Sequence, residues 1–330
     1  MTNSWLRINF VLPLVALACA VVSLGIGPAD LGWGRTFAGL VGSGDPVAHT
    51  ILWELRLPRA LLALMIGAVL GAAGAALQGY LRNPLADPAV VGVSSSAALG
   101  AVAAIVLGIA GNPLVLFACA MLSAGGSMAL LAALTWRSPS PVQFILAGTV
   151  LASLAGALTA FLISIAPNPY AVAEVIDWLM GALTDRSIED VRTALPFMAV
   201  GAILLFLTAP SLDALTLGEA AGRSLGVRLG RLQVLVVLGT GLTIGASVAV
   251  TGVVGFVGLV VPHLLRPIFG HRPAALLLPS ALGGAALVLV ADSLCRLAPG
   301  AGEVRLGVAM ALLGAPFFLM LLLKGRASWN

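Results

Sequence analysis

The sequence predicts an all-α, polytopic membrane protein with about ten transmembrane helices, several of them short or broken. Of its 330 residues, 60% are hydrophobic and only 9% are charged, whereas an average soluble domain carries about 25% charged residues. So few charges cannot cover the surface of a soluble fold of this size. The 39 glycines fit this class, because small residues let helix backbones approach closely in a lipid-embedded bundle. The composition excludes an ordinary cytosolic enzyme, a disordered chain and a nucleic-acid-binding domain.

The first apolar run covers residues 8–27 and approaches the length of about 20 residues that a membrane span needs. A signal peptide is the alternative, because residues 16–20 resemble a cleavage site. The run continues through that site, which favours an uncleaved first span. The mixed segment 28–59 is predicted to lie along one membrane surface. Residues 60–81 form the second span, in which Gly67 and Gly71 make a GxxxG face for close helix packing.

Prolines and polar residues divide the rest of the chain into eight further apolar segments. Two prolines break the chain at 82–88, since proline lacks the amide donor that a helix needs. Residues 167–192 form a surface excursion, and residues 211–231 are the longest polar interruption of the second half. Short or broken helices in a membrane must be buried in protein or line a wet cavity, which favours a transport pathway. The eight predicted segments are 90–107, 114–136, 142–166, 193–209, 232–251, 255–269, 274–294 and 306–323.

An even number of spans places both ends of the chain on one side of the membrane. That side would carry ten lysines and arginines, against seven on the other. The excess predicts that both termini are cytoplasmic, since basic residues accumulate in cytoplasmic loops. The chain is therefore interpreted as one transmembrane domain over residues 1–330, with its largest cytoplasmic loop at about 211–231.

Missing residue types exclude several functions. The only lysine is Lys324, and no glycine-rich loop precedes it, so the chain has no phosphate-binding loop for ATP. An ion-coupled secondary transporter needs an ionisable group at mid-membrane, but Asp177 and Asp292 fall near the ends of predicted segments, and His263 is interpreted as a hydrogen-bonded helix residue. No metal or catalytic pattern appears. The cysteines at 19, 119 and 295 are interpreted as small core residues.

Five blocks of sequence, in order, resemble the permeases of the iron–siderophore, haem and vitamin B12 ABC importers. The resemblance runs from about residue 50 to 325. It is highly specific for the family and much less specific for the cargo. The blocks are Leu55-Arg56-Leu57-Pro58-Arg59; Gln78 to Pro88 with Val91-Gly92-Val93-Ser94; Leu217 to Gly226; Gly255 to His263; and Leu313 to Phe318.

The resemblance implies the ten-helix fold of a type II ABC importer permease in the bacterial inner membrane. It implies a homodimer whose pathway lies on the two-fold axis, together with two ATP-binding cassette subunits and a periplasmic substrate-binding protein. The chain itself would then be no enzyme. ATP and magnesium would be bound by the partner ATPase, and this chain would hold no cofactor of its own.

The resemblance also implies roles for particular residues. Arg56, Arg59 and Arg296 would dock the binding protein through its carboxylates, since arginine pairs with carboxylate in a bidentate geometry; the alternative is anchoring at the membrane interface. The loop at 211–231 would seat a pair of short helices on the ATPase, and Glu219 and Arg223 could pair with each other or with that partner. The residues predicted for this coupling are Leu217, Gly218, Glu219, Ala220, Ala221, Gly222 and Arg223.

A cytoplasmic gate is expected at two turns. Asn83 and Leu85 belong to the turn after the second span, and Ser138 and Ser140 belong to the turn before residues 142–166. Contacts with the cargo are expected in the outer segment 166–187, which is similar to the haem-importing branch. Tyr170 and Met180 would offer aromatic or soft contacts, and Arg186 would meet a carboxylate of haem. Haem is the favoured cargo, with ferric siderophore and vitamin B12 as alternatives.

Overall fold

The computed structural model describes residues 2–42, 44–136, 140–298 and 302–327, and within these ranges it contains helices and no strands. In this described part of the chain, six helices are long and apolar enough to cross a membrane, and four more apolar helices are shorter. These ten match the ten predicted segments one for one, so the predicted fold class is confirmed. They are α1 (Thr2–Gly25), α4 (Leu57–Tyr80), α5 (Val93–Val106), α6 (Pro113–Thr135), α7 (Pro141–Ser164), α9 (Ile188–Leu207), α12 (Leu229–Thr251), α13 (Val257–Phe269), α14 (Pro273–Leu297) and α15 (Leu306–Ala327).

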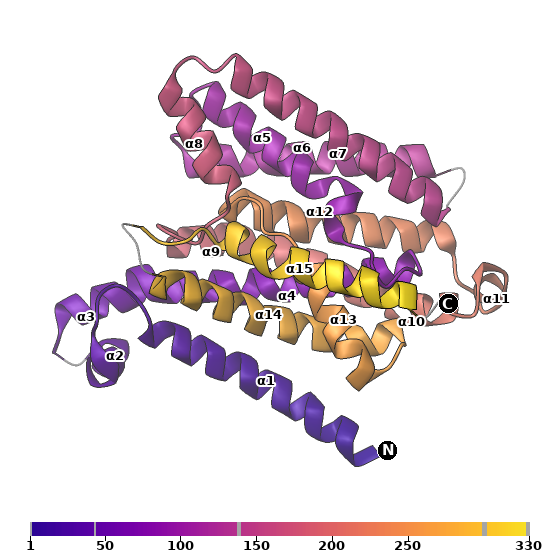
Figure 1. The fold of residues 1–330 in the computed structure, drawn as a ribbon, viewed down its shortest axis with the longest axis horizontal. Helices are drawn as coiled ribbons and strands as arrows, with labels where there is room; N and C mark the ends of the chain where they lie inside the picture. The colour runs from indigo at the N-terminus through magenta and orange to yellow at the C-terminus, as the bar shows by residue number, and fades with distance from the viewer. Residues whose placement is uncertain (1, 43, 137–139, 299–301, 328–330) are drawn as a thin grey trace.

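Short helices mark the two ends of the bundle (Figure 1). One end carries α2 (Gly32–Val41), α3 (Pro46–Thr50), the π-helical turn η1 (Ile51–Arg56) and the loops on either side of α8 (Pro169–Leu179), and is called the α2 end. The other end carries α10 (Ala209–Leu215), α11 (Glu219–Ser224) and the 3-10 turn η2 (Pro88–Val91), and is called the α11 end. Helix α1 begins and α15 ends toward the α11 end, as an even number of spans requires.

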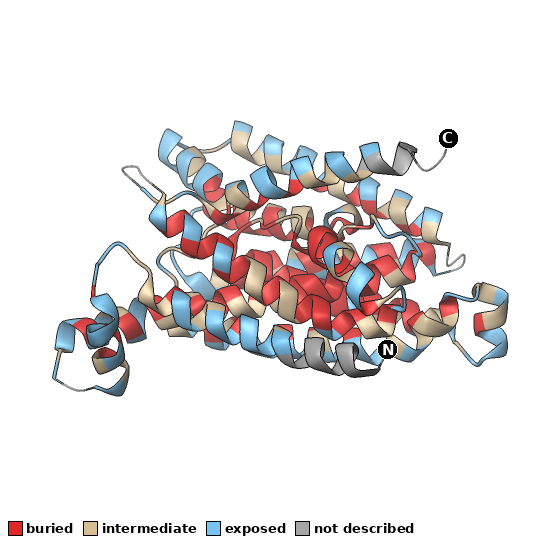
Figure 2. Ribbon diagram, turned by 60° about the horizontal axis from the view of Figure 1, so that its bottom comes forward, coloured by how far each residue is buried: buried red, intermediate tan, exposed pale blue. Residues whose placement is uncertain are grey.

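Helix α4 is the centre of the bundle. It packs against α14, α13, α9 and α12, and most of its residues are buried. By contrast, most residues of α6 and α7 are exposed or only partly buried. Figure 2 shows the buried residues gathered in the middle of the bundle and the exposed ones on its outer helices. An apolar outer surface is what lipid requires, so the exposed leucines and valines of α6 and α7 need no further partner.

Glycines set the contact between α4 and its neighbours. A Cβ atom added at Gly67 would lie 2.2 Å from the carbonyl oxygen of Gly284, and one at Gly71 would lie 2.0 Å from that of Ser280. Gly74 approaches Gly258 just as closely, with a Cβ-to-oxygen distance of 2.0 Å. Real Cβ atoms do not reach such distances, so only glycine permits this packing. The predicted GxxxG face of Gly67 and Gly71 is therefore confirmed, with α14 as its partner.

Irregular backbone is buried inside the bundle near the α2 end. The Ala182 amide donates to the Thr251 carbonyl at 2.8 Å, and the Gly307 amide donates to the Gly181 carbonyl at 3.1 Å. Gly181 and Gly252 have φ angles of 69° and 72°, a conformation that glycine adopts without strain. The loop after α8 thus bonds to the end of α12 and to the start of α15, which is how a membrane protein accommodates non-helical backbone.

Candidate functional site

The three arginines predicted to dock a binding protein lie together at the α2 end, where Arg56 and Arg296 are buried and Arg59 is partly buried. Arg56 is 5% exposed and Arg296 is 8% exposed. The guanidinium of Arg56 donates to the carbonyl oxygens of Leu24 at 2.8 Å and Ala29 at 2.5 Å. Interface anchoring by snorkelling needs a water-exposed head group, so it does not describe Arg56 or Arg296.

Arg59 and Arg296 share one carboxylate. The Nε atom of Arg59 lies 3.0 Å from both carboxylate oxygens of Asp292, and a terminal nitrogen lies 2.9 Å from Oδ1. A terminal nitrogen of Arg296 lies 3.1 Å from the Oδ2 atom of Asp292. Asp292 is fully buried. Because this carboxylate is neutralised by two cations, it is no free ionisable group of the kind that an ion-coupled carrier uses.

Glu303 adds a second carboxylate to the same network. Its Oε2 atom lies 2.7 Å from a terminal nitrogen of Arg59. The side chain of Glu303 is 20% exposed, against 1% for that of Asp292. Arg59 is therefore held by one carboxylate inside the bundle and by one near the surface.

A cavity of about 360 Å³ lies against this network at the α2 end. Four arginines line it, and among the described residues the acidic side chains on its wall are those of Asp185 and Glu303. We call it the arginine cavity; its charged lining residues are Arg56, Arg59, Arg186, Arg296, Asp185 and Glu303. The structure thus brings Arg186, which the sequence assigned to cargo contact, into the same site as the three arginines predicted to dock a binding protein.

Arg186 differs from the other arginines of the cavity in having no partner. Its Nε atom is buried and donates no hydrogen bond, and no acidic side chain among the described residues lies within ion-pairing distance. Burial lowers the pKa of this guanidinium, while the more distant carboxylates of Asp190 and Asp185 raise it. Asp190 is occupied by the capping box of α9, where it accepts from Ser187.

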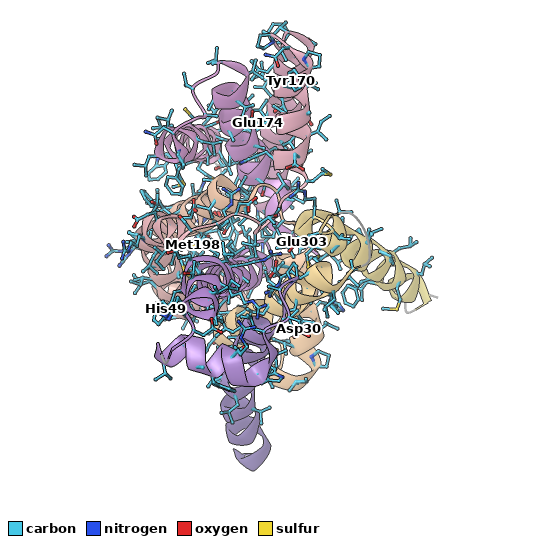
Figure 3. The ribbon with its side chains drawn as sticks, turned by 90° about the vertical axis from the view of Figure 1, so that its left-hand side faces the viewer. Asp30, His49, Tyr170, Glu174, Met198 and Glu303 are labelled. Atoms are coloured by element: carbon cyan, nitrogen blue, oxygen red, sulfur yellow. The ribbon has the colours of Figure 1, made fainter. Side chains whose placement is uncertain are left out.

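Tyr170 and Met180 are not brought together with Arg186. Tyr170 is 85% exposed near the first turn of α8, and Met180 is the C-cap of the same helix. Their separation of ten positions corresponds to about 15 Å of helix. Figure 3 shows Tyr170 at the tip of α8, well apart from Glu303. One molecule of the chain therefore does not form a single pocket from all three predicted cargo contacts.

The predicted coupling loop folds as two short helices, α10 and α11. Gly218 and Gly226, on either side of α11, have φ angles of 97° and 90°, so each permits a turn that other residues resist. Leu217 is 67% exposed and Leu225 is 64% exposed, and Ala220 and Arg223 are exposed between them. This exposed, partly apolar edge is the surface that the loop offers to a partner.

Two details of the coupling loop differ from the sequence-based interpretation. Glu219 pairs with Arg82 at 3.2 Å rather than with Arg223, because the turn after α4 reaches the start of α11. Gly222 is buried, and a Cβ atom there would lie 3.3 Å from the Leu215 side chain. Gly222 therefore packs α11 onto α10, and only Leu217, Ala220, Arg223 and their exposed neighbours can contact another protein.

The predicted gate residues lie at the α11 end. The Oδ1 atom of Asn83 accepts from the Leu85 amide at 3.0 Å, so the turn is held by its own side chain. Ser140 is the N-cap of α7, and Ser138 lies outside the described residues. The rings of Tyr80 and Phe144 meet edge to face with centroids 5.3 Å apart, which places the end of α4 beside the start of α7.

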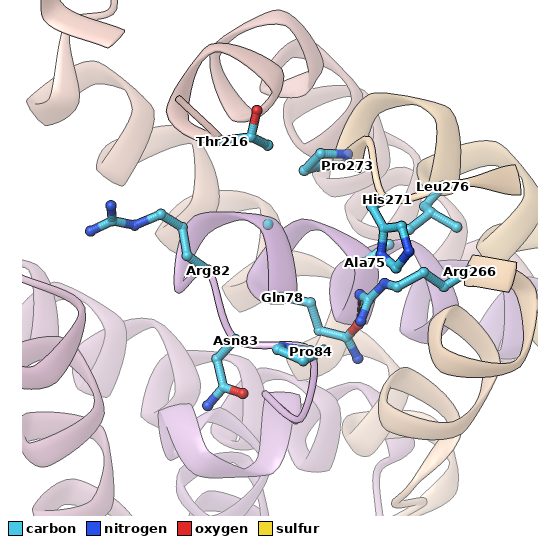
Figure 4. A pocket seen from close by; sticks show the side chains of 11 residues that line it. Ala75, Gln78, Arg82, Asn83, Pro84, Thr216, Arg266, His271, Pro273 and Leu276 are labelled. Atoms are coloured by element: carbon cyan, nitrogen blue, oxygen red, sulfur yellow. Dashed lines mark hydrogen bonds between the residues drawn. The ribbon is translucent and has the colours of Figure 1, made fainter. Parts of the chain in front are cut away.

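Sequence analysis missed a polar pocket of about 270 Å³ beside the gate turn. Arg266 donates to the Oε1 atom of Gln78 at 2.6 Å, and Gln78 donates to the Gly258 carbonyl at 3.3 Å. Figure 4 shows Arg266 and Gln78 meeting near His271, while Arg82 points away. Sequence analysis also missed Asp292 and Glu303 as partners of the arginines predicted to dock a binding protein. The signal for Asp292 was its position four residues before Arg296.

Ten apolar helices, irregular backbone buried between them and different polar surfaces at the two ends define a polytopic membrane permease. The model of the FecCD transport family matches residues 14–324, and the chain belongs to this family of ABC importer permeases. It is a multi-pass protein of the inner membrane.

Individual relatives match over nearly the whole chain. The vitamin B12 import system permease protein BtuC of Vibrio cholerae is 36% identical over 329 residues, which cover 98% of this chain and 96% of the relative. The hemin transport system permease protein HmuU of Yersinia pestis is 36% identical over 327 residues, covering 97% and 98%. A solved structure described as an inward-facing metal-chelate type ABC transporter has a TM-score of 0.86 at 32% identity and covers 96% of this chain and 99% of that one.

Proposed function

We propose that this chain is the permease subunit of an ATP-driven haem importer. Two copies form the pathway, two ATPase subunits bind at the α11 end, and a periplasmic binding protein docks at the α2 end. Both termini are then cytoplasmic. The chain hydrolyses no ATP itself, and ATP and magnesium are bound by the partner ATPase.

The contrast between the two ends carries this proposal. The α11 end presents a protruding helix pair with exposed Leu217 and Leu225, which suits a groove on a second protein. The α2 end presents a cavity lined by four arginines, which suits the carboxylates of a delivering protein. The gate residues Asn83, Leu85, Ser138 and Ser140 are proposed to close the pathway between these ends on the ATPase side.

Haem is supported by one named relative and by the chemistry of the outer segment. HmuU carries hemin in its name, and Tyr170 offers an exposed aromatic ring on which a flat macrocycle could stack. Since one chain does not gather Tyr170, Met180 and Arg186, these residues are proposed to meet the cargo at successive stages of transfer. Vitamin B12 is the second candidate, because the sequence identity of BtuC to this chain, 36%, equals that of HmuU.

Uptake by reconstituted liposomes tests the cargo. The permease is reconstituted with its cognate ATPase and binding protein, and haem, a ferric siderophore and vitamin B12 are offered one at a time with ATP inside. We expect ATP-dependent uptake of haem and background uptake of the other two. Uptake of vitamin B12 or the siderophore without haem would overturn the cargo while leaving the permease assignment in place.

A further inference from the structure

A cavity of about 390 Å³ lies at the α11 end, where α12 begins beside α11 (Figure 1). The end of α9, the start of α10 and the first turns of α12 form its wall. We call it the α12 cavity; its lining residues include Leu207, Ser211, Arg228, Arg231, Leu232 and Leu235.

Arg228 and Arg231 bring two positive charges to the α12 cavity, and no acidic side chain of the described chain lines it. Both arginines are exposed. Among the described residues, neither guanidinium has a hydrogen-bond or ion-pair partner. Arg272, at the same end of the bundle, differs in being paired with Asp213 at 2.6 Å. The charge of the α12 cavity is therefore unbalanced within the chain and suits an anion that comes from outside it.

Apolar side chains continue from the α12 cavity along the outer faces of α9 and α12. On α9, Ile203 and Leu207 are exposed and lie on one face, four positions apart. On α12, Leu235 and Leu238 follow Arg231 at four and seven positions, so they share its face, and Leu238 is exposed. Helices α9 and α12 pack against each other, and the two faces meet where Leu207 and Leu235 line the cavity. Exposed leucines of a membrane span face lipid acyl chains.

We infer that the α12 cavity binds an anionic phospholipid, with Arg228 and Arg231 on its phosphate and the leucines of α9 and α12 along an acyl chain. Basic pockets between transmembrane helices, at the level of the head groups, bind lipids of this class. A phosphodiester supplies the negative charge and the acceptor oxygens that guanidinium groups bind. The volume of about 390 Å³ leaves room for this group and its glycerol. The inference goes beyond the proposed function, since it concerns the membrane around the chain and not its cargo.

Native mass spectrometry of the full-length permease, released from detergent with phosphatidylglycerol or phosphatidylcholine added over a range of concentrations, tests the inference. We expect the wild type to bind phosphatidylglycerol more tightly than phosphatidylcholine. The affinity for phosphatidylglycerol should fall about fivefold in Arg228→Gln or Arg231→Gln and about 25-fold in the double variant, since each arginine contributes one head-group contact. Arg228→Lys/Arg231→Lys should keep most of the affinity, because both charges remain.

Arg223→Gln is the matched control for this measurement. Arg223 is an exposed arginine of α11, at the same end of the bundle and outside the α12 cavity. Its loss should leave the affinity for phosphatidylglycerol unchanged. Equal affinities of the wild type for the two lipids, or of the wild type and the double glutamine variant for phosphatidylglycerol, would overturn the inference. An equal loss in Arg223→Gln would overturn it too, because the effect would then follow net charge and not the cavity.

The occupant is identified by three further measurements. Excess inorganic phosphate should not displace the lipid, and Leu207→Asn should weaken phosphatidylglycerol binding several-fold, because the acyl chain is part of the ligand. Displacement by phosphate, or an unchanged affinity of Leu207→Asn, would assign the α12 cavity to a soluble anion and overturn the inference. The assembled permease–ATPase complex should retain the lipid. Release of the lipid on assembly would assign both arginines to contact with the ATPase and would overturn the inference as well.

Discussion

Replacing Asp292 with alanine should lower the free energy of unfolding by about 3–5 kcal/mol, the usual cost of breaking a buried ion pair. Asp292 is fully buried and pairs with Arg59 at 2.9 Å and Arg296 at 3.1 Å. The variant would leave both cations in the bundle with no common anion. Equilibrium unfolding in detergent micelles, followed by circular dichroism, measures the loss.

Glu189→Ala is the control for this prediction. Glu189 pairs with Arg192 on the surface, where both side chains are mostly exposed, and such pairs contribute at most about 1 kcal/mol. If Asp292→Ala unfolds at the same denaturant concentration as Glu189→Ala, the charge network does not hold α4 to α14 as described.

Gly71→Ala should be as damaging as the loss of Asp292, although it adds a single methyl group. That methyl would lie 2.0 Å from the Ser280 carbonyl oxygen, so α4 and α14 would have to separate. Overpacking typically costs about 1–3 kcal/mol, and we expect about 3 kcal/mol or more here because the obstacle is backbone rather than a movable side chain. The same unfolding experiment measures it.

The substitution Gly126→Ala should raise the free energy of unfolding rather than lower it. Gly126 lies within α6 and a Cβ atom there would meet nothing within 4 Å, so alanine should stabilise the helix by up to about 1 kcal/mol. Equal destabilisation by Gly71→Ala and Gly126→Ala would show that the effect is not due to packing of α4 against α14.

Much of the fold follows from the sequence because lipid imposes a simple rule. An apolar run near the length of a span becomes a helix, and the prolines at 84, 88, 113 and 141 mark interruptions between helices. The GxxxG face could be predicted from spacing alone, but its partner could not. Gly284 and Ser280 face Gly67 and Gly71 only because α14 packs beside α4, and this packing depends on the tertiary structure.

The functional site was less predictable for the same reason. The arginines predicted to dock a binding protein were identified from local motifs, but their partners lie far away in the chain, as Ala29 does for Arg56 at a separation of 27 residues and Asp292 for Arg59 at 233. At Gly222, the local sequence predicted a role that differs from the one in the structure. Its lack of a side chain indicated a contact surface, yet it serves the packing of α11 on α10.

The central claim is that ATP hydrolysis by a partner drives cargo through this chain by way of the helix pair α10–α11. The most direct test measures ATP hydrolysis and cargo uptake together in liposomes that hold the wild type or the double variant Leu217→Asp/Leu225→Asp. Both leucines are exposed, so the variant should remain folded. The account predicts ATP-dependent uptake by the wild type, no uptake by the permease without its ATPase, and loss of uptake in the variant. Uptake at the wild-type rate by the double variant, or uptake without the ATPase, would contradict it.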